Sequence, residues 1–287
     1  MSAVDVQALR GWIGRQETRS DTIFPTPVAQ LSATLDHPQP RAIAGEVLPP
    51  LWHWLYFLPV TPASGIDLDG HARRGGFLPP VPLPRRMWAG SDIRFVAPLR
   101  VGDAIERVSV VEDVSHKHGR SGDLVFVTVL HRVFCHAVLA LEERQSLVYR
   151  EAVAGEAAAV PTERAPASAH WSRSIVPDPV LLFRYSALTF NSHRIHYDRD
   201  YALAREGYAG LVVQGPLTAT LLMDLLHREM PGVHLQSFRF RGVRPLLDGA
   251  AMQLQGRCDG ERVELWALDG EGALAMSACA TLARGTG

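Results

Sequence analysis

The sequence predicts an α+β protein made of two similar halves, each with an antiparallel sheet packed against a helix. The first observation is a shared pattern: Arg94-Phe-Val-Ala-Pro-Leu-x-x-Gly102 reappears as Arg241-Gly-Val-Arg-Pro-Leu-x-x-Gly249 in the other half of the chain. The second is that β-rich runs with turn signals follow this pattern in both halves. The third is the run Leu217–Leu226, whose apolar residues on almost every side are typical of a buried helix that can cover a sheet.

The first half contains helices and strands of the kind expected for such a unit. We expect an exposed amphipathic helix over residues 3–17, a second helix over residues 28–35, and a short helix or buried extended segment over residues 51–57. The aromatic residues of the last segment are expected in the core. Strands are expected over residues 92–96, 104–114 and 124–134.

Residues 59–86 are rich in proline and glycine and are predicted to form a long surface loop. Loops of this length in a compact domain are usually functional or disordered. Arg73, Arg74, Arg85 and Arg86 place four positive charges on this segment. It is therefore either a solvated loop or the mouth of a site that binds an anion, such as a nucleotide phosphate or a carboxylate.

The composition changes between the two halves. Residues 151–170 are rich in Ala, Pro and Glu and have no apolar period, which indicates a linker between an N-terminal half, residues 1–150, and a C-terminal half, residues 171–287. In the second half, strands are expected over residues 252–258, 263–268 and 273–282, with a hairpin turn at residues 269–272.

The candidate functional residues lie between the linker and these last strands. Asp178-Pro179 predicts a capped helix that ends near Phe190, and a polar loop follows at residues 191–196. A short helix is expected over residues 201–205. Gly215-Pro216 then opens the apolar helix, residues 217–228.

Three kinds of group in this stretch suit proton transfer next to a carbonyl group. His193 and His196 have unperturbed pKa values near neutrality, and Asn191 offers a side-chain amide. The backbone N–H of Gly215, at a helix N-terminus, suits a developing oxyanion. The histidines could instead be solvated loop residues. They could also ligate a metal, but no further carboxylate or cysteine completes a recognisable set in the sequence, so no metal is expected.

The loop resembles that of the MaoC-like, R-specific enoyl-CoA hydratases and dehydratases, which have the hotdog fold. In that family it runs Asp-x-Asn-Pro-x-His-x-Asp, before a helix that begins at a His-Gly pair. The variant here, Phe190-Asn-Ser-His-Arg-Ile-His-Tyr-Asp198, and the stretch Arg85-Arg-Met-Trp-Ala-Gly90 resemble the branch that contains mesaconyl-C4-CoA and itaconyl-CoA hydratases. The resemblance implies a double hotdog, in which two antiparallel sheets are each wrapped on a central helix. Only the second half has this loop with its two histidines, residues 191–198, which we call the histidine loop. We therefore expect one active site per chain, with the degenerate first half helping to form the substrate channel.

The resemblance also implies an activity, the reversible hydration of a short-chain α,β-unsaturated acyl-CoA thioester. No cofactor is implied beyond the coenzyme A of the substrate. His196 matches the family's catalytic histidine, and Gly215 matches the glycine whose N–H binds the thioester oxygen. Asn191 falls where the catalytic aspartate usually lies, and Gln214 replaces the customary histidine beside the substrate. Because an amide cannot act as a general base, His193 is a candidate source of the basicity, and Asn191 would hold the water or orient an imidazole.

Arginines are the candidate contacts for the charges of the substrate. The branch resemblance implies a short dicarboxylic acyl group, and its free carboxylate would need a cation, for which Arg194, Arg85 and Arg86 are candidates. Arg239 and Arg241 share one face of an expected strand and could contact coenzyme A phosphates. Alternatively, this face is solvated or forms an ordinary ion pair.

Two other functions stay open, an acyl-CoA thioesterase and a non-catalytic acyl-CoA-binding module.

The composition argues against a nucleic-acid-binding protein and against a membrane-spanning protein. A net charge of −1 gives no general basic field for nucleic acid, and no apolar run approaches the roughly 20 residues of a membrane span. Three cysteines without metal or redox spacing suit a reducing compartment, so a cytoplasmic location is expected. A homodimer of double hotdogs is compatible with this interpretation.

Overall fold

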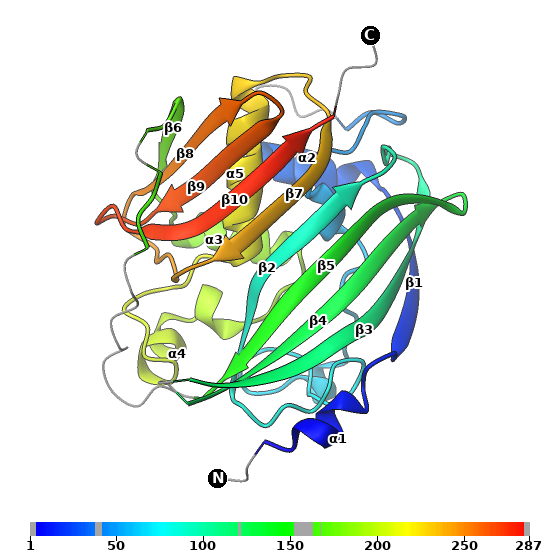
Figure 1. Cartoon of the computed structure of the whole chain (residues 1–287), viewed down its shortest axis with the longest axis vertical. Coiled ribbons are helices and arrows are strands. Elements are labelled where there is room, and N and C mark those ends of the chain that lie inside the picture. Colours follow the sequence, from blue (N-terminus) through cyan, green and yellow to red (C-terminus); the bar gives the residue numbers. More distant parts are fainter. Residues whose placement is uncertain (1–3, 38–41, 120–121, 152–162, 167, 284–287) are drawn as a thin grey trace.

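The computed structural model describes residues 4–37, 42–119, 122–151, 163–166 and 168–283, and Figure 1 shows its arrangement. The described strands form one antiparallel sheet in the order β1-β3-β4-β5-β2-β7-β10-β9-β8-β6. The first half contributes β1 (Gln16–Thr22), β2 (Arg85–Phe95), β3 (Ala104–Gly119), β4 (Gly122–Cys135) and β5 (Val138–Arg150). The second half contributes β6 (Trp171–Ile175), β7 (Leu235–Gly242), β8 (Met252–Asp259), β9 (Arg262–Leu268) and β10 (Leu274–Leu282).

The strand order repeats between the two halves. From the centre outward, the first half has β2, β5, β4, β3 and β1, and the second half has β7, β10, β9, β8 and β6. The repeated sequence pattern thus begins at the ends of the two central strands, β2 and β7, as a duplicated unit requires. The α+β class and the repeat are confirmed. The two half-sheets are not separate, however, because β2 pairs with β7 from Gly90 opposite Arg241 to Arg94 opposite Ser237.

A glycine makes this junction possible. A Cβ atom at Gly90 would lie 2.2 Å from the carbonyl oxygen of Phe240, far inside van der Waals contact. The two central strands therefore approach each other here at a distance that no side chain permits.

The helices are short except for one. They are α1 (Val6–Arg10), α2 (Pro25–Thr34), α3 (Pro179–Leu188), α4 (Arg199–Ala204) and α5 (Gly215–Glu229), with 3-10 turns η1 (Trp52–Leu55), η2 (Ala63–Gly65) and η3 (Arg194–His196). The expected helix over residues 3–17 is confirmed only over α1 and is wrong beyond it, because α1 ends at Arg10 and residues 16–22 form edge strand β1. The polar, alternating sequence of β1 concealed a strand that has one face exposed. Strand β5 was also missed, because its centre, Glu142-Glu-Arg-Gln145, is charged.

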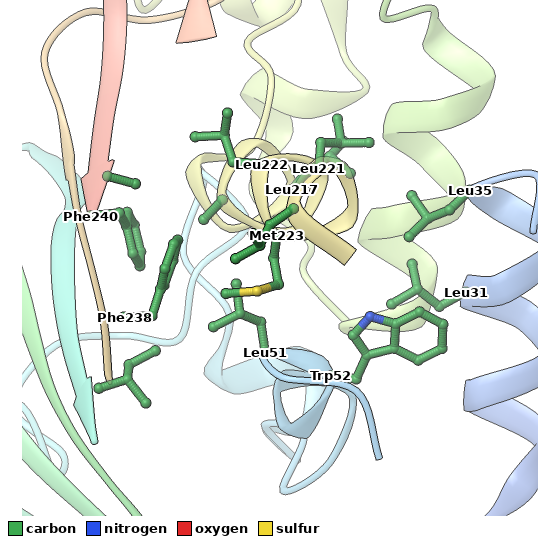
Figure 2. Close-up of a cluster of buried hydrophobic side chains, with 14 of the residues drawn as sticks. Leu31, Leu35, Leu51, Trp52, Leu217, Leu221, Leu222, Met223, Phe238 and Phe240 are labelled. Atoms are coloured by element: carbon green, nitrogen blue, oxygen red, sulfur yellow. The ribbon is translucent and has the colours of Figure 1, made fainter. Parts of the chain in front are cut away.

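Helix α5 is the centre of the core. Its residues Leu217 to Leu226 are all buried, as the apolar sequence predicted. Figure 2 shows Phe238 and Phe240 of the sheet on one side of α5, and Leu31, Leu35 and Trp52 on the other. Met223 points toward Leu51 between them. Full burial of each such side chain stabilises the fold by roughly 1.5–3 kcal/mol, so α5 anchors the second half-sheet.

The inner face of the first half-sheet differs from that of the second half-sheet, because part of it lines a cavity. Its longest described helix, α2, packs against α3 and η1. Side chains of β4 and β5 instead line a cavity, among them Val129, Val133, Leu141 and Leu147. Part of the expected linker, residues 152–162 and 167, lies outside the described residues. Among the helices that the structure describes, none has both the length and the apolar character needed to span a bilayer.

Candidate active site

The histidine loop is shaped by bonds to its own backbone. Helix α3 starts at the N-cap Asp178, whose side chain accepts a hydrogen bond from the N–H of Leu181, as expected. After α3 the chain turns at Phe190, which has a positive φ of 48°. Asn191 Oδ1 then accepts a hydrogen bond from the backbone N–H of His193 at 3.1 Å. These turns direct His193 and His196 inward, where each side chain is only 7% exposed.

His196 is held in one orientation by the backbone before α5. Its Nδ1 lies 2.7 Å from the carbonyl oxygen of Val212, and because a carbonyl only accepts, Nδ1 carries the hydrogen. Nε2 is left free to accept a proton or a hydrogen bond. Burial lowers the pKa of His196 to about 4, although the bond to Val212 opposes this shift. The ring is therefore neutral at neutral pH.

Helix α5 starts shortly after the residue that holds this ring. Val212, which holds His196, is three residues before Gly215, and both His196 and Gly215 line the same cavity. Gly215 is the first residue of α5, so its N–H has no intrahelical partner, and no described residue accepts a hydrogen bond from it. His196 and the free amide of Gly215 thus line one cavity.

Gln214 lines the same cavity, and its side-chain amide nitrogen is bonded to helix α3. Its Nε2 donates hydrogen bonds to the carbonyl oxygen of Leu182 and to Ser186 Oγ, both at 2.9 Å. The side chain is 1% exposed and joins α5 to α3. Gln214 thus joins two helices through its amide nitrogen, while its Oε1 accepts no hydrogen bond from any described residue, and the substrate contact stays a prediction.

The long loop over residues 59–84 brings two further functional groups to the site, Asp69 and His71. The backbone N–H of Arg194 donates to the carbonyl oxygen of Asp69 at 2.9 Å, and Ser192 Oγ donates to that of Gly70 at 2.5 Å. A Cβ atom at Gly70, which has φ +91°, would lie 1.8 Å from the carbonyl oxygen of Ser192. The loop is docked on the histidine loop by its main chain, and only glycine fits at the contact.

This docking places His71 against the predicted histidines. The ring centroids of His71 and His193 are 4.0 Å apart, and those of His193 and His196 are 5.4 Å apart. Asp69 Oδ2 lies 2.9 Å from His71 Nδ1. Sequence reasoning missed this pair. The Pro- and Gly-rich loop was recognised as a candidate mouth, but its contact with a segment some 120 residues away is set by the fold.

The predicted arginines separate into different environments. Arg86 lines the cavity and is half-buried, and its guanidinium makes no hydrogen bond or ion pair with any residue that the structure describes. Arg85 pairs with Glu206 and lies over the ring of Tyr208. The remaining three, Arg194, Arg239 and Arg241, do not line the cavity and pair with Asp198, Asp92 and Glu163. Of the candidates for a substrate carboxylate, the geometry therefore favours Arg86.

The cavity has a volume of about 860 Å³ and is lined by residues of both halves. The second half contributes the histidine loop and the start of α5. The first half contributes the long loop and the inner face of β4 and β5. A cavity of this size can enclose an acyl group and part of its carrier.

Residues 51–248 match the family model of hydroxyacyl-thioester dehydratase type 2. Over 284 residues, the chain is 49% identical to the mesaconyl-C(4)-CoA hydratase of Chloroflexus aurantiacus, which covers 98% of this chain and 99% of the relative. The chain belongs to the hydroxyacyl-thioester dehydratase type 2 family. Hydratases and dehydratases are hydro-lyases, so this chain is an enzyme of that class.

Solved structures support the fold of this hydroxyacyl-thioester dehydratase. HtdX from Mycobacterium tuberculosis superimposes with a TM-score of 0.66 at 19% identity, covering 92% of this chain and 98% of its own. A second M. tuberculosis protein, described as having a double hotdog fold, superimposes with a TM-score of 0.58 at 12% identity, covering 94% and 96%. The predicted double hotdog is confirmed.

Proposed function

We propose that this enzyme reversibly hydrates an α,β-unsaturated acyl-CoA thioester that carries a carboxylate on its β-carbon, as in a mesaconyl-C4 thioester. The observation that carries the proposal is the meeting of three groups at one cavity: the free Nε2 of His196, the free N–H of Gly215, and the unpaired guanidinium of Arg86. The mesaconyl-C(4)-CoA hydratase that shares 49% of its residues with this chain supports the same substrate class.

Each group has a task in this reaction. Water attacks the β-carbon, and negative charge develops on the thioester oxygen, where the N–H of Gly215 would receive it. Removing one such donor typically costs about 2.7–4 kcal/mol of transition-state stabilisation. Nε2 of His196 accepts a hydrogen bond from the attacking water and holds it against the β-carbon. This role requires a neutral imidazole, and burial of His196 favours the neutral form.

The carboxylate of the substrate needs a cation close to the reacting atoms. In a mesaconyl-C4 thioester the carboxylate and a methyl group are both attached to the β-carbon, so the carboxylate lies within a few ångströms of the bond that forms. Arg86 stands opposite Tyr149 in the β2–β5 pairing and shares the cavity with His71 and His193. Its planar guanidinium can bind a carboxylate through two parallel hydrogen bonds.

The test of the proposed function is a substrate panel with the unmodified enzyme. Mesaconyl-C4-CoA, itaconyl-CoA and crotonyl-CoA are supplied in turn, and loss of the enoyl absorbance is followed. We expect the fastest hydration with mesaconyl-C4-CoA. Release of free coenzyme A, detected with a thiol reagent, would identify a thioesterase instead. Tight binding without either signal would identify a binding module.

Replacing Arg86 tests the carboxylate contact. Arg86→Gln is expected to lower kcat/KM for mesaconyl-C4-CoA by about tenfold to a hundredfold, the range of about 1.5–3 kcal/mol typical of hydrogen bonds to charged groups. Hydration of 3-methylcrotonyl-CoA, which has a methyl group in place of the carboxylate, should change little. Arg94→Gln on the exposed face of β2 is the matched control, since Arg94 does not line the cavity. An equal loss with both substrates would contradict this assignment.

A further inference from the structure

The histidine loop itself holds no carboxylate that contacts an imidazole. Within residues 191–198, all of which the structure describes, the only acidic residue is Asp198, which caps α4 and pairs with Arg194. Asn191 occupies the position expected for a base and is bonded to the backbone of His193. An imidazole that takes a proton from water becomes positively charged, and a buried positive charge needs a nearby negative group. Within their own loop, His193 and His196 therefore have no carboxylate partner, and no carboxylate is hydrogen-bonded to either ring among the described residues. The nearby Asp69 carboxylate raises the pKa of His193, but burial and the neighbouring histidines His71 and His196 lower it more.

A carboxylate reaches the histidines from the first half of the chain. Asp69 accepts hydrogen bonds from both the ring Nδ1 and the backbone N–H of His71, at 2.9 and 2.8 Å. The rings of His71, His193 and His196 form a row that ends on this carboxylate. Because Nδ1 of His71 is turned to Asp69, Nε2 is its free nitrogen, and it makes no hydrogen bond to any described residue. His71 lines the cavity, and the docked backbone of the long loop fixes its position.

We propose that His71 is the general base that activates water and that Asp69 is its positioning residue. Together they replace the carboxylate that Asn191 lacks. The inference rests on the proposed hydratase function and deepens it, because it assigns the catalytic base to the half of the chain outside the histidine loop. It also gives a role to the close docking of the long loop at Gly70, because this contact holds Asp69 and His71 at the cavity.

The proton moves without any further reactant. Nε2 of His71 accepts a proton from water as the water oxygen forms a bond to the β-carbon. The electron pair of the C=C bond moves to the α-carbon and the thioester oxygen. The imidazolium of His71 then returns the proton to the α-carbon, so that one water molecule is added and both ring and carboxylate are restored. His196 holds the second O–H of the same water through Nε2.

The charges around His71 are consistent with a neutral resting base. The charged or titratable groups that face it are Asp69 and Arg74 of its own loop, Arg86 of β2, and His193 and His196 of the histidine loop. Burial lowers the pKa of His71, Arg86 lowers it further, and the Asp69 carboxylate opposes both. A substrate carboxylate bound at Arg86 would offset the effect of that arginine and make His71 more basic when substrate is present.

The first test is removal of the base. His71→Ala is expected to lower kcat for mesaconyl-C4-CoA by at least about a hundredfold, the low end for general acid–base catalysis, with a smaller change in KM. Imidazole added to the solution should restore part of the lost rate, which a purely structural role of His71 would not allow. Near-wild-type kcat in His71→Ala, or a loss that imidazole does not restore in a folded variant, would overturn the proposal.

The second test is the pH profile. Because the base must be neutral, the rate falls as the pH drops through the pKa of His71. Asp69 raises that pKa, so Asp69→Asn should move the acidic limb of the profile to lower pH and lower the plateau by about tenfold or more. Asp67→Asn is the matched control, since the Asp67 side chain is exposed on the same loop and bonds to the backbone of Leu68, not to His71. The bond from the backbone N–H of Asp67 to the carbonyl oxygen of His71 is kept in this variant. An acidic limb that stays in place in Asp69→Asn would contradict the assignment.

A metal ion is the competing interpretation, because donor atoms of Asp69, His71 and His193 all lie within 4.8 Å of one another. Metal analysis of the purified protein, with assays after dialysis against a chelator, separates the two. Full activity without bound metal supports the base, whereas one metal per chain whose removal abolishes activity overturns it. The proposed function fails separately, if the unmodified enzyme hydrates no member of the panel.

Discussion

Replacing His196 with alanine is expected to lower kcat for mesaconyl-C4-CoA by at least about a hundredfold, or about 2.7 kcal/mol of transition-state stabilisation. The reason is geometric. The bond from Nδ1 to the carbonyl of Val212 leaves only Nε2 for the reaction, and Nε2 faces the cavity that Gly215 also lines. Loss of this ring removes a contact made to the attacking water, so kcat should fall more than KM rises.

A second variant separates this role from packing. In His196→Asn the amide nitrogen can still donate to the carbonyl of Val212, but no group replaces Nε2, so the activity should stay low while the thermal stability returns toward that of the unmodified protein. His234→Ala, an exposed histidine before β7, is the control and should retain full activity. Substantial activity in His196→Asn would show that only the structural bond matters.

Gly70→Ala is expected to have an effect as large as the loss of His71. The new Cβ would collide with the carbonyl of Ser192, and the φ of +91° is itself unfavourable for alanine. The long loop must then move away from the histidine loop, which carries Asp69 and His71 out of position. We expect kcat to fall by about a hundredfold or more, as for the loss of an acid–base group.

Gly75→Ala controls for the backbone cost alone. Gly75 has φ +90° in the same loop, and a Cβ there would meet nothing closer than 3.6 Å. It should therefore show only the conformational penalty, about 1–2 kcal/mol of stability, with kcat almost unchanged. Equal kcat values for the two alanine variants would show that docking of the loop at Gly70 does not support catalysis.

Much of the second half could be predicted from local chemistry. The N-cap Asp178, the Gly215-Pro216 helix start and the unbroken apolar run of α5 are short-range signals, and each forms the expected element. The end of the first helix and strands β1 and β5 could not be predicted in this way. The sequence of β5 contains Glu143, which looks like a surface residue but is buried and bonded to His53, Trp54 and Ser91.

The residues of the candidate site show the same difference between local sequence signals and long-range contacts. His193, His196 and Gly215 were predicted because they are close in sequence and their spacing carries a chemical meaning. Asp69 and His71 were missed because nothing within the loop shows which distant segment it contacts. Among the arginines, residue type alone could not distinguish Arg86 from Arg85 or Arg194, because what separates them is whether a carboxylate partner is already present.

The junction between β2 and β7 has a consequence for whether the two halves of the chain can be separated. The proposed water-activating pair, Asp69 and His71, and the proposed thioester-binding helix α5 lie on opposite sides of this junction. On this proposal neither half is a self-sufficient unit. A separately expressed side would also present an unpaired strand edge, β2 or β7, that favours aggregation. We expect the two halves to be inactive when each is expressed alone. They should regain turnover only when they are co-expressed and reassemble through the pairing of β2 with β7.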